Sequence, residues 1–325
     1  MDIHPELRAL RGDDSPQRDA QEALHQAMAG WRGKPEVAAL IDSLTAFANG
    51  AALADCPELA ALFEAGNGAA PALAADFTAA TAEALAAAPL GHVPLRHFTD
   101  GVSSTLLLIR TGNVTLSLVA IDGLGLHGKP EPATARFGPN QTWEHVLTGR
   151  ADAELVECQP SGPRQAELHR KAVSIEPGTV AFRDGEHEAR LLHHIDGALV
   201  SLRLQRRWEG AGPTREYDLA TGALLRQTAG NPRDSRIELM LALLGRMGRK
   251  DAAPLMAELA RDEGSTALRW QALRECLALD TLAGFQTLCA VAAAPGDALA
   301  GPAGALRAQL VEAHPQLQEF APCPA

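Results

Sequence analysis

The chain has 325 residues, enough for two or three ordinary domains, and its hydrophobic fraction of 46% is sufficient for packed cores. The 29 basic and 40 acidic side chains give a formal net charge of −11, which repels nucleic acid rather than attracting it. The 5 cysteines are scattered and include no CxxC pair, which argues against a disulfide scaffold and the usual zinc modules.

The amino terminus lacks the features of a targeting segment. Residues 1–6 contain no basic stretch followed by an apolar run. No uninterrupted apolar segment of about 18 residues occurs anywhere in the chain. We therefore expect a cytoplasmic protein whose partners include neither nucleic acid nor a membrane.

Residues 15–88 are rich in alanine and have the punctuation of consecutive helices. Ser15-Pro16 is a typical helix start, and Gly33 stops the segment that follows it. Apolar residues then recur at helical spacing as far as Pro89. We predict an N-terminal helical region over residues 1–90, with helices at about 15–33, 35–48, 57–66 and 72–88.

From Val93 the spacing of apolar residues changes to that of strands. Thr111-Gly112 separates two runs rich in leucine and β-branched residues, 104–110 and 113–121, which predicts a hairpin. Further strands are predicted at 133–137, 144–147, 151–158, 166–175, 179–183, 189–195 and 198–205. Short strands separated by turn residues favour an antiparallel barrel or sandwich, which we place at residues 91–230.

Past Pro232 apolar residues again recur at helical spacing, and the pattern repeats after about 30 residues. The matched positions are Met240 with Trp270, Leu243 with Leu273, Met247 with Leu277, Leu255 with Phe285, and Leu259 with Cys289. Capping residues stand before the apolar runs at Ser235, Asp251, Ser265 and Asp280. A last helix is predicted at 303–313.

Helix pairs of this length resemble HEAT-type repeats, which bury their apolar faces by stacking on a neighbouring pair. The resemblance implies a repeat domain over residues 231–325 that presents a surface to a protein partner. A generic bundle of similar helix lengths is the alternative.

Two segments of the middle region resemble the cupin family. Residues 143–151, WEHVLTGRA, are similar to its "VLxG" element, and residues 175–182, IEPGTVAF, are similar to its "PGxxxF" element. Both elements place a glycine at a turn beside apolar strands, here Gly149 and Gly178. The resemblance implies a β-barrel, and in that family the barrel mouth usually holds a divalent metal on an HxH pair, a glutamate and a third histidine.

The residues at the corresponding positions are not metal ligands. Counted back from Gly149, the HxH pair falls at Ala135 and Phe137, and the glutamate falls at Thr142. A two-residue shift brings Glu144 to the glutamate position but puts Phe137 and Pro139 at the paired histidines. The third histidine falls at Ala189, and only a shorter turn brings His187 there. The resemblance therefore implies a barrel that has lost or moved its metal site, so we predict no cofactor.

Eight of the 11 histidines nevertheless fall between residues 92 and 194. They leave open a relocated Fe, Mn, Cu or Zn ion held by His145, His187 and Glu144, in a metal-dependent oxygenase or isomerase. The simpler interpretation is that these histidines occupy half-exposed strand positions, since no HxH, HxxxH or HExxH spacing occurs among them.

The densest basic cluster lies at the end of the last predicted strand. We place Arg203 and Arg206 of this cluster, together with Trp143, in a binding site for a carboxylate or phosphate. The alternative is a solvated strand end that pairs with some of the many carboxylates.

We therefore predict an α+β, multi-domain chain with a cupin-like central barrel. The predicted function is a non-enzymatic binding or regulatory protein, in which the metal-free barrel holds a small ligand or peptide and the C-terminal helices engage a protein partner. A metal-dependent enzyme and a small-molecule sensor remain alternatives, and the sequence does not decide whether the chain catalyses a reaction.

Overall fold

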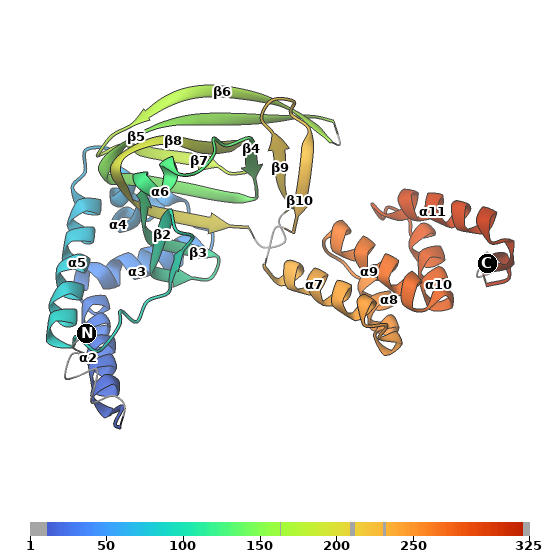
Figure 1. The fold of residues 1–325 in the computed structure, drawn as a ribbon, viewed down its shortest axis with the longest axis horizontal. Coiled ribbons are helices and arrows are strands. Elements are labelled where there is room, and N and C mark those ends of the chain that lie inside the picture. The colour runs from blue at the N-terminus through green and yellow to red at the C-terminus, as the bar shows by residue number, and fades with distance from the viewer. Residues whose placement is uncertain (1–11, 163, 209–211, 230–231, 321–325) are drawn as a thin grey trace. The chain divides into compact units, whose positions relative to one another are not determined.

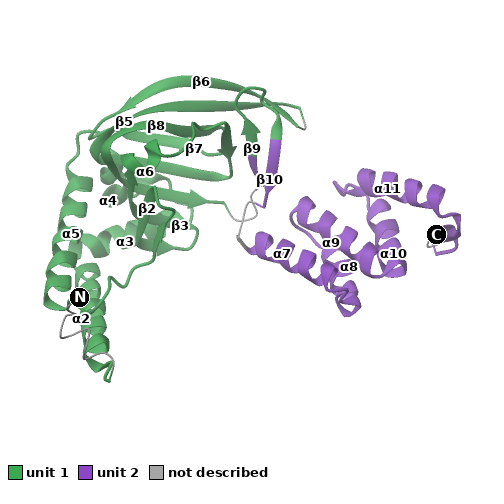
Figure 2. Ribbon diagram, in the orientation of Figure 1, with its two compact units in different colours: residues 1–208, 216–224 green, residues 209–215, 225–325 purple. Residues whose placement is uncertain are grey.

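The computed structural model describes residues 12–162, 164–208, 212–229 and 232–320. It has N-terminal helices, central antiparallel sheets and C-terminal helices, as predicted for an α+β, multi-domain protein (Figure 1). The chain divides into two compact units, residues 1–208 with 216–224 and residues 209–215 with 225–325 (Figure 2). The N-terminal helices, which we expected to form a region of their own at 1–90, belong to the same unit as most of the strands.

The N-terminal helices begin and end close to the residues predicted from the sequence. A proline stands in the first turn of α2, α3 and α4, where its missing N–H costs no helical hydrogen bond. The segments are α2 (Ser15–Arg32), α3 (Pro35–Ala48), η1 (Leu53–Asp55), α4 (Pro57–Ala60), η2 (Ala61–Phe63) and α5 (Ala69–Ala87). Four helical segments were predicted here, and α2, α3, the α4–η2 pair and α5 match them.

The strands of the middle region form two sheets. They are β1 (His97–Thr99), β2 (Ser103–Thr111), β3 (Val114–Asp122), β4 (Thr134–Phe137), β5 (Asn140–Gly162), β6 (Gln165–Ile175), β7 (Val180–Asp184), β8 (Glu188–Arg207), β9 (Thr214–Asp218) and β10 (Leu224–Thr228). The larger sheet has the order β1-β2-β3-β8-β5-β6, with β7 also paired to β5, and the smaller has the order β10-β9-β4. The strand pairs of the larger sheet, β1–β2, β2–β3, β3–β8, β8–β5, β5–β6 and β5–β7, are antiparallel, and the hairpin at Thr111-Gly112 is confirmed.

The long strands β5 and β8 replace four shorter strands of the sequence prediction. The pairing of β5 with β8 shifts register on both sides of Thr148, and Gly149 has a φ of +92°. A side chain at Gly149 would collide with the carbonyl oxygen of Ala198. Our prediction of a turn between two strands at this glycine was wrong, because Gly149 lies at a bulge that bends one continuous strand. Gly178, with a φ of +83°, does lie in the turn between β6 and β7.

The N-terminal helices pack against one face of the larger sheet. One core cluster joins Trp31, Leu44 and Phe47 of the helices to Leu116 and Leu204 of the sheet. Figure 1 shows these helices gathered beside the part of the sheet that contains β2 and β3. The opposite face carries a second apolar cluster, which includes Ile121, Val146 and Leu199, and beside it the buried polar side chains of Glu144 and Ser201.

The second unit is helical apart from the short strand segments near the unit boundary. Its helices are α7 (Pro232–Arg246), η3 (Lys250–Ala252), α8 (Ala253–Arg261), α9 (Thr266–Leu279), α10 (Thr281–Ala292), α11 (Ala300–Ala313) and η4 (Pro315–Phe320). Helix α7 packs on α9, and α8 packs on both α9 and α10.

Two of the four predicted helix caps in this unit are confirmed. Ser265 caps α9 by accepting a hydrogen bond from Leu268 N, and Asp280 caps α10 by accepting one from Ala283 N. Ser235 lies inside α7, and Asp251 lies in the short helix η3, so neither caps a helix at the predicted place. In the described part of the chain no helix is long and apolar enough to cross a membrane.

Candidate functional site

The centre of the candidate site is Glu144, a carboxylate that is 1% exposed on strand β5. Its Oε1 atom accepts hydrogen bonds from Ser201 Oγ at 2.7 Å and Arg203 Nη2 at 3.1 Å. Its Oε2 atom lies 2.6 Å from Arg190 Nη1 and 3.3 Å from Arg183 Nη1. One buried carboxylate therefore faces three guanidinium groups.

Strand pairing explains this convergence. Glu144 lies directly opposite Arg203 in the β5–β8 pair, and Thr142 lies opposite Arg183 in the β5–β7 pair. Alternate residues of a strand share a face, so these side chains emerge on the side of the sheet away from the N-terminal helices. Arg190 reaches the same carboxylate from the first half of β8.

The charges at the site shift two pKa values. Burial raises the pKa of Glu144, but the charges of Arg190, Arg203 and Arg183, with the hydrogen bond from Ser201, outweigh burial and hold that pKa well below its usual range. Burial and the neighbouring charges of Arg190 and Arg203 together lower the pKa of Arg183 to about 10, against the opposing effect of Glu144. Glu144 is therefore ionised at neutral pH, and Arg183 is held in its charged form at a cost.

A cavity of about 280 Å³ opens above this cluster. Four arginines line it, together with polar, apolar and acidic residues: Arg136, Arg183, Arg190, Arg203, Asn140, Thr142, Gln205, Gly185, Glu188, Ile121 and Leu192. Arg136 is already paired with Glu216 at 3.3 Å. The three remaining arginines face Glu144 and Glu188, so the cavity carries a surplus of positive charge and suits an anion.

Arg203 has an unused hydrogen-bond donor. Its Nη2 atom binds Glu144, whereas its Nε atom is buried and has no hydrogen-bond partner in the described structure. A buried donor without an acceptor costs about 1–3 kcal/mol, and a bound water, ion or ligand that accepts its hydrogen bond would remove this cost.

A second hollow of about 520 Å³ shares Arg203 and Gln205 with the arginine cavity. It extends over Thr115 and Ser117 of β3 to Phe98 of β1, whose side chain is 65% exposed. We call this second hollow the trough. Arg96, Arg203 and Arg207 line it and no acidic residue is among its lining residues, so the trough also suits a negatively charged ligand.

The predicted ligand residues are divided between the two faces of the sheet. Arg203 lies in the arginine cavity, as the sequence analysis proposed. Arg206 and Trp143 lie on the other face, where the Arg206 guanidinium stands 4.3 Å from the ring centre of Phe47 and 5.9 Å from that of Trp143. Arg206 also donates to Gln141 Oε1 at 2.6 Å. These two residues therefore attach the N-terminal helices to the sheet.

The structure does not bring His145, His187 and Glu144 together. His145 is buried on the helix-facing side, and its Nδ1 atom lies 2.7 Å from the carbonyl oxygen of Leu62. His187 is in the exposed turn after β7, with Nδ1 3.2 Å from Asp184 Oδ2. Within the described residues no group of three or more His, Cys, Asp or Glu side chains is placed to hold a metal ion. These residues do not fit the divalent ion that a cupin resemblance implies.

The two positions that correspond to the paired histidines of the cupin family also lie in apolar surroundings. Ala135 and Phe137 of β4 are buried in a cluster with Val156 and Tyr217. The ring centres of Phe137 and Tyr217 are 6.1 Å apart in an edge-to-face arrangement. Side chains at these positions hold the smaller sheet against β5 and do not reach the cavity lining.

Arg136, Arg183 and Arg190 were not predicted from the sequence. Arg183 and Arg190 flank the short turn between β7 and β8, and both are largely buried, with side chains 14% and 10% exposed. A pair of arginines placed symmetrically about a predicted hairpin is a weak signal, because arginines at strand ends are common. Their partner carboxylate, Glu144, was singled out from the sequence only as a possible metal ligand.

Comparisons with known proteins find likeness in structure alone. No family model matches the chain, and none of the curated proteins matches its sequence. Ectoine synthase from P. lautus is similar over 34% of this chain and 68% of its own, at 11% identity and a TM-score of 0.23. A cupin superfamily protein from Desulfitobacterium hafniense DCB-2 is similar over 34% of this chain and 83% of its own, at 11% identity and a TM-score of 0.24.

The 7S globulin of Momordica charantia is similar over 39% of this chain and 36% of its own, at 16% identity and a TM-score of 0.26. This chain thus spans only about a third of that protein. At such scores the likenesses assign neither a family nor an activity to the chain.

Proposed function

We propose that the chain is a non-enzymatic binding protein whose cupin-like β region holds a small organic anion in the arginine cavity. The observation that carries the proposal is the convergence of Arg183, Arg190 and Arg203 on the single buried carboxylate of Glu144, with Nε of Arg203 buried and unbonded. Guanidinium groups in fixed positions bind carboxylates and phosphates through charged hydrogen bonds.

The size and lining of the cavity define the class of ligand. The arginine cavity alone, at about 280 Å³, has the volume of roughly nine water molecules, which is enough for the acidic end of a small ligand. Asn140, Thr142 and Gln205 add amide and hydroxyl groups beside the arginines. We therefore propose a ligand with one carboxylate or phosphate and neighbouring hydroxyl groups, whose remaining atoms extend along the trough toward Phe98.

The proposed ligand binds without a metal ion. Both oxygen atoms of Glu144 are occupied by four donors, which leaves this carboxylate poorly suited to coordinate a cation. Elemental analysis of freshly purified protein is the check. Stoichiometric iron, manganese, copper or zinc that is lost together with Glu144 would contradict this part of the proposal.

Isothermal titration calorimetry with phosphate, malonate, glycerate and uncharged glycerol tests the anion site. We expect the anions to bind and glycerol to give no heat. Replacement of Arg203 by Met should weaken anion binding at least about tenfold, because a charged hydrogen bond contributes about 1.5–3 kcal/mol.

Arg206→Met is the matched control, because Arg206 belongs to the same strand but lies on the other face. It should leave anion affinity within about twofold. Equal losses in the two variants, or no anion binding by the unaltered protein, would overturn the proposal.

We also propose that α7–α8 and α9–α10 are two HEAT-like repeats that engage a protein partner. Helix α7 packs on α9 and α8 packs on α10, so equivalent helices of successive pairs stack on each other. The spacing of about 30 residues between matched apolar positions in the sequence supports this proposal.

A further inference from the structure

The two helix pairs of the C-terminal unit provide an internal comparison of equivalent positions. In the second pair, Leu273 and Phe285 are completely buried and Cys289 is 3% exposed. In the first pair, the equivalent Leu243 and Leu255 are 58% and 69% exposed. The same repeat positions are therefore apolar in both pairs but covered in only one.

Stacking accounts for this difference. The side chains of α9 and α10 at these positions are covered because α7 and α8 lie against them. No described helix of the unit lies against the equivalent side of α7 and α8. We name this surface the α7–α8 face and define it by Met240, Leu243, Met247, Leu255 and Leu259, of which all but the half-buried Leu259 are more than half exposed.

A terminal repeat normally presents a polar outer side to water. The other end of the unit follows this rule, since α11 has exposed Arg307, Gln309 and Glu312. The α7–α8 face does not follow it, and an apolar patch of this kind is typical of an interaction surface. Stacking of copies head to tail is disfavoured, because the polar α11 end is not complementary to an apolar face.

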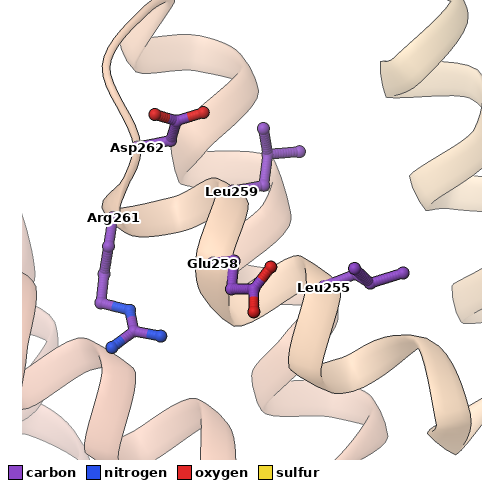
Figure 3. Close-up of a pocket in the computed structure, with 5 residues that line it drawn as sticks. All are labelled: Leu255, Glu258, Leu259, Arg261 and Asp262. Carbon is purple, nitrogen blue, oxygen red and sulfur yellow. The ribbon is translucent and has the colours of Figure 1, made fainter.

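The two helices of the α7–α8 face carry exposed charges of opposite sign. The fully exposed charged residues of α7 are basic, namely Arg233, Arg236 and Arg246, while its acidic residues Asp234 and Glu238 are half-buried. Glu258 and Asp262 lie beside the leucines of α8. Figure 3 shows Leu255, Glu258 and Leu259 along one side of α8, with the Arg261 side chain directed away from them. A shallow hollow of about 560 Å³ lies there, lined by Leu255, Leu259 and the two carboxylates together with Arg261.

We propose that the α7–α8 face binds the same face of a second copy of this chain. A two-fold axis parallel to the helices sets the basic α7 of one copy against the acidic α8 of the other, and does so twice. The exposed Met240 and Leu243 of each copy then enter the hollow beside Leu255 and Leu259 of its partner. An axis perpendicular to the helices would instead set basic α7 against basic α7. This inference is independent of the anion site.

Sedimentation equilibrium of the full chain tests the proposal. The unaltered protein should have twice the chain mass of 34.2 kDa, and Leu243→Arg should raise the dissociation constant at least about 30-fold, as expected for a central interface residue. Leu282→Arg is the control, because Leu282 is 46% exposed on α10 outside the face. It should leave the mass unchanged, with the helical circular dichroism equal in all three proteins.

Charge reversal tests the orientation. R236E/R246E should weaken association, and the combined variant R236E/R246E/E258R/D262R should restore it, because the charges of α7 and α8 are then reversed together. Four outcomes would overturn the proposal: a monomer at 100 μM, a dimer unaffected by Leu243→Arg, equal losses in Leu243→Arg and Leu282→Arg, or no restoration by the combined variant. A monomer whose α7 amides are protected from exchange would show that the chain covers this face itself.

Discussion

Replacing Glu144 by Gln removes one charge and leaves the shape of the buried side chain almost unchanged. The amide keeps one acceptor oxygen, so at least two of the four donors that now reach the carboxylate lose their acceptor. Charged hydrogen bonds contribute about 1.5–3 kcal/mol each, and breaking a buried ion pair on one side costs about 3–5 kcal/mol. We therefore expect Glu144→Gln to lower the free energy of unfolding by about 3–5 kcal/mol.

Urea unfolding followed by tryptophan fluorescence measures this loss, since Trp31, Trp143 and Trp208 belong to the unit that contains the site. Glu188→Gln is the matched control, because Glu188 lines the same cavity but is only half-buried, and it should cost less than about 1 kcal/mol. Sulfate should restore more stability to Glu144→Gln than to the unaltered protein. A loss below about 1 kcal/mol would refute the claim that the three arginines depend on this carboxylate.

The pH dependence of the same variant has a defined sign. The pKa of Glu144 is lowered in the folded chain, so its contribution is complete above its unfolded pKa of about 4.3 and is lost as the pH falls toward the folded value. The difference in unfolding free energy between the unaltered protein and Glu144→Gln should therefore be constant from pH 5 to 8 and shrink below about pH 4. A difference that already shrinks between pH 8 and 6 would contradict the ionised carboxylate.

Two further substitutions test the fold that positions the site and the repeats. Gly149→Ala should destabilise the chain by about 2–4 kcal/mol, because the added methyl meets the carbonyl of Ala198, whereas Gly178→Ala has open space and should cost only about 1 kcal/mol in thermal unfolding. Arg269→Met should lower the unfolding free energy of the helical unit by about 3 kcal/mol, since Arg269 is 9% exposed and binds both oxygens of Asp297 and the carbonyl of Ala260. The control Arg274→Met removes an exposed side chain and should cost less than about 0.5 kcal/mol, both measured by circular dichroism. Equal effects within the glycine pair or within the arginine pair would contradict the assigned contacts.

Local patterns in the sequence predict most elements of the fold. Prolines at the first turns of α2, α3 and α4 marked three helix starts, and Gly112 marked the β2–β3 hairpin. Gly149 and Gly197 misled the prediction in the same way, since both have a positive φ but lie within continuous long strands. A glycine in the left-handed region is compatible with a turn or with a bulge, and only the partner strand decides between them.

Of the short elements, β4 and β7 were predicted, whereas β1, β9, β10 and the helix α6 (Gly123–His127) were not, because three to five residues give little periodic signal. The arginine cavity was predictable only in part for a different reason. Arg183, Arg190 and Arg203 meet at Glu144 through pairing among β5, β7 and β8, over separations of up to 59 residues. Alternation along β8 could have separated Arg203 from Arg206, since residues three apart on a strand face opposite sides.

A crystal structure of the protein with selenate tests the central claim most directly, because selenium in the anion is located by its anomalous scattering. The account predicts a selenate in the arginine cavity, with an oxygen within about 3.2 Å of Arg203 Nε and further oxygens near Arg183 or Arg190. A cavity that holds only water, beside selenate bound elsewhere on the chain, would contradict it.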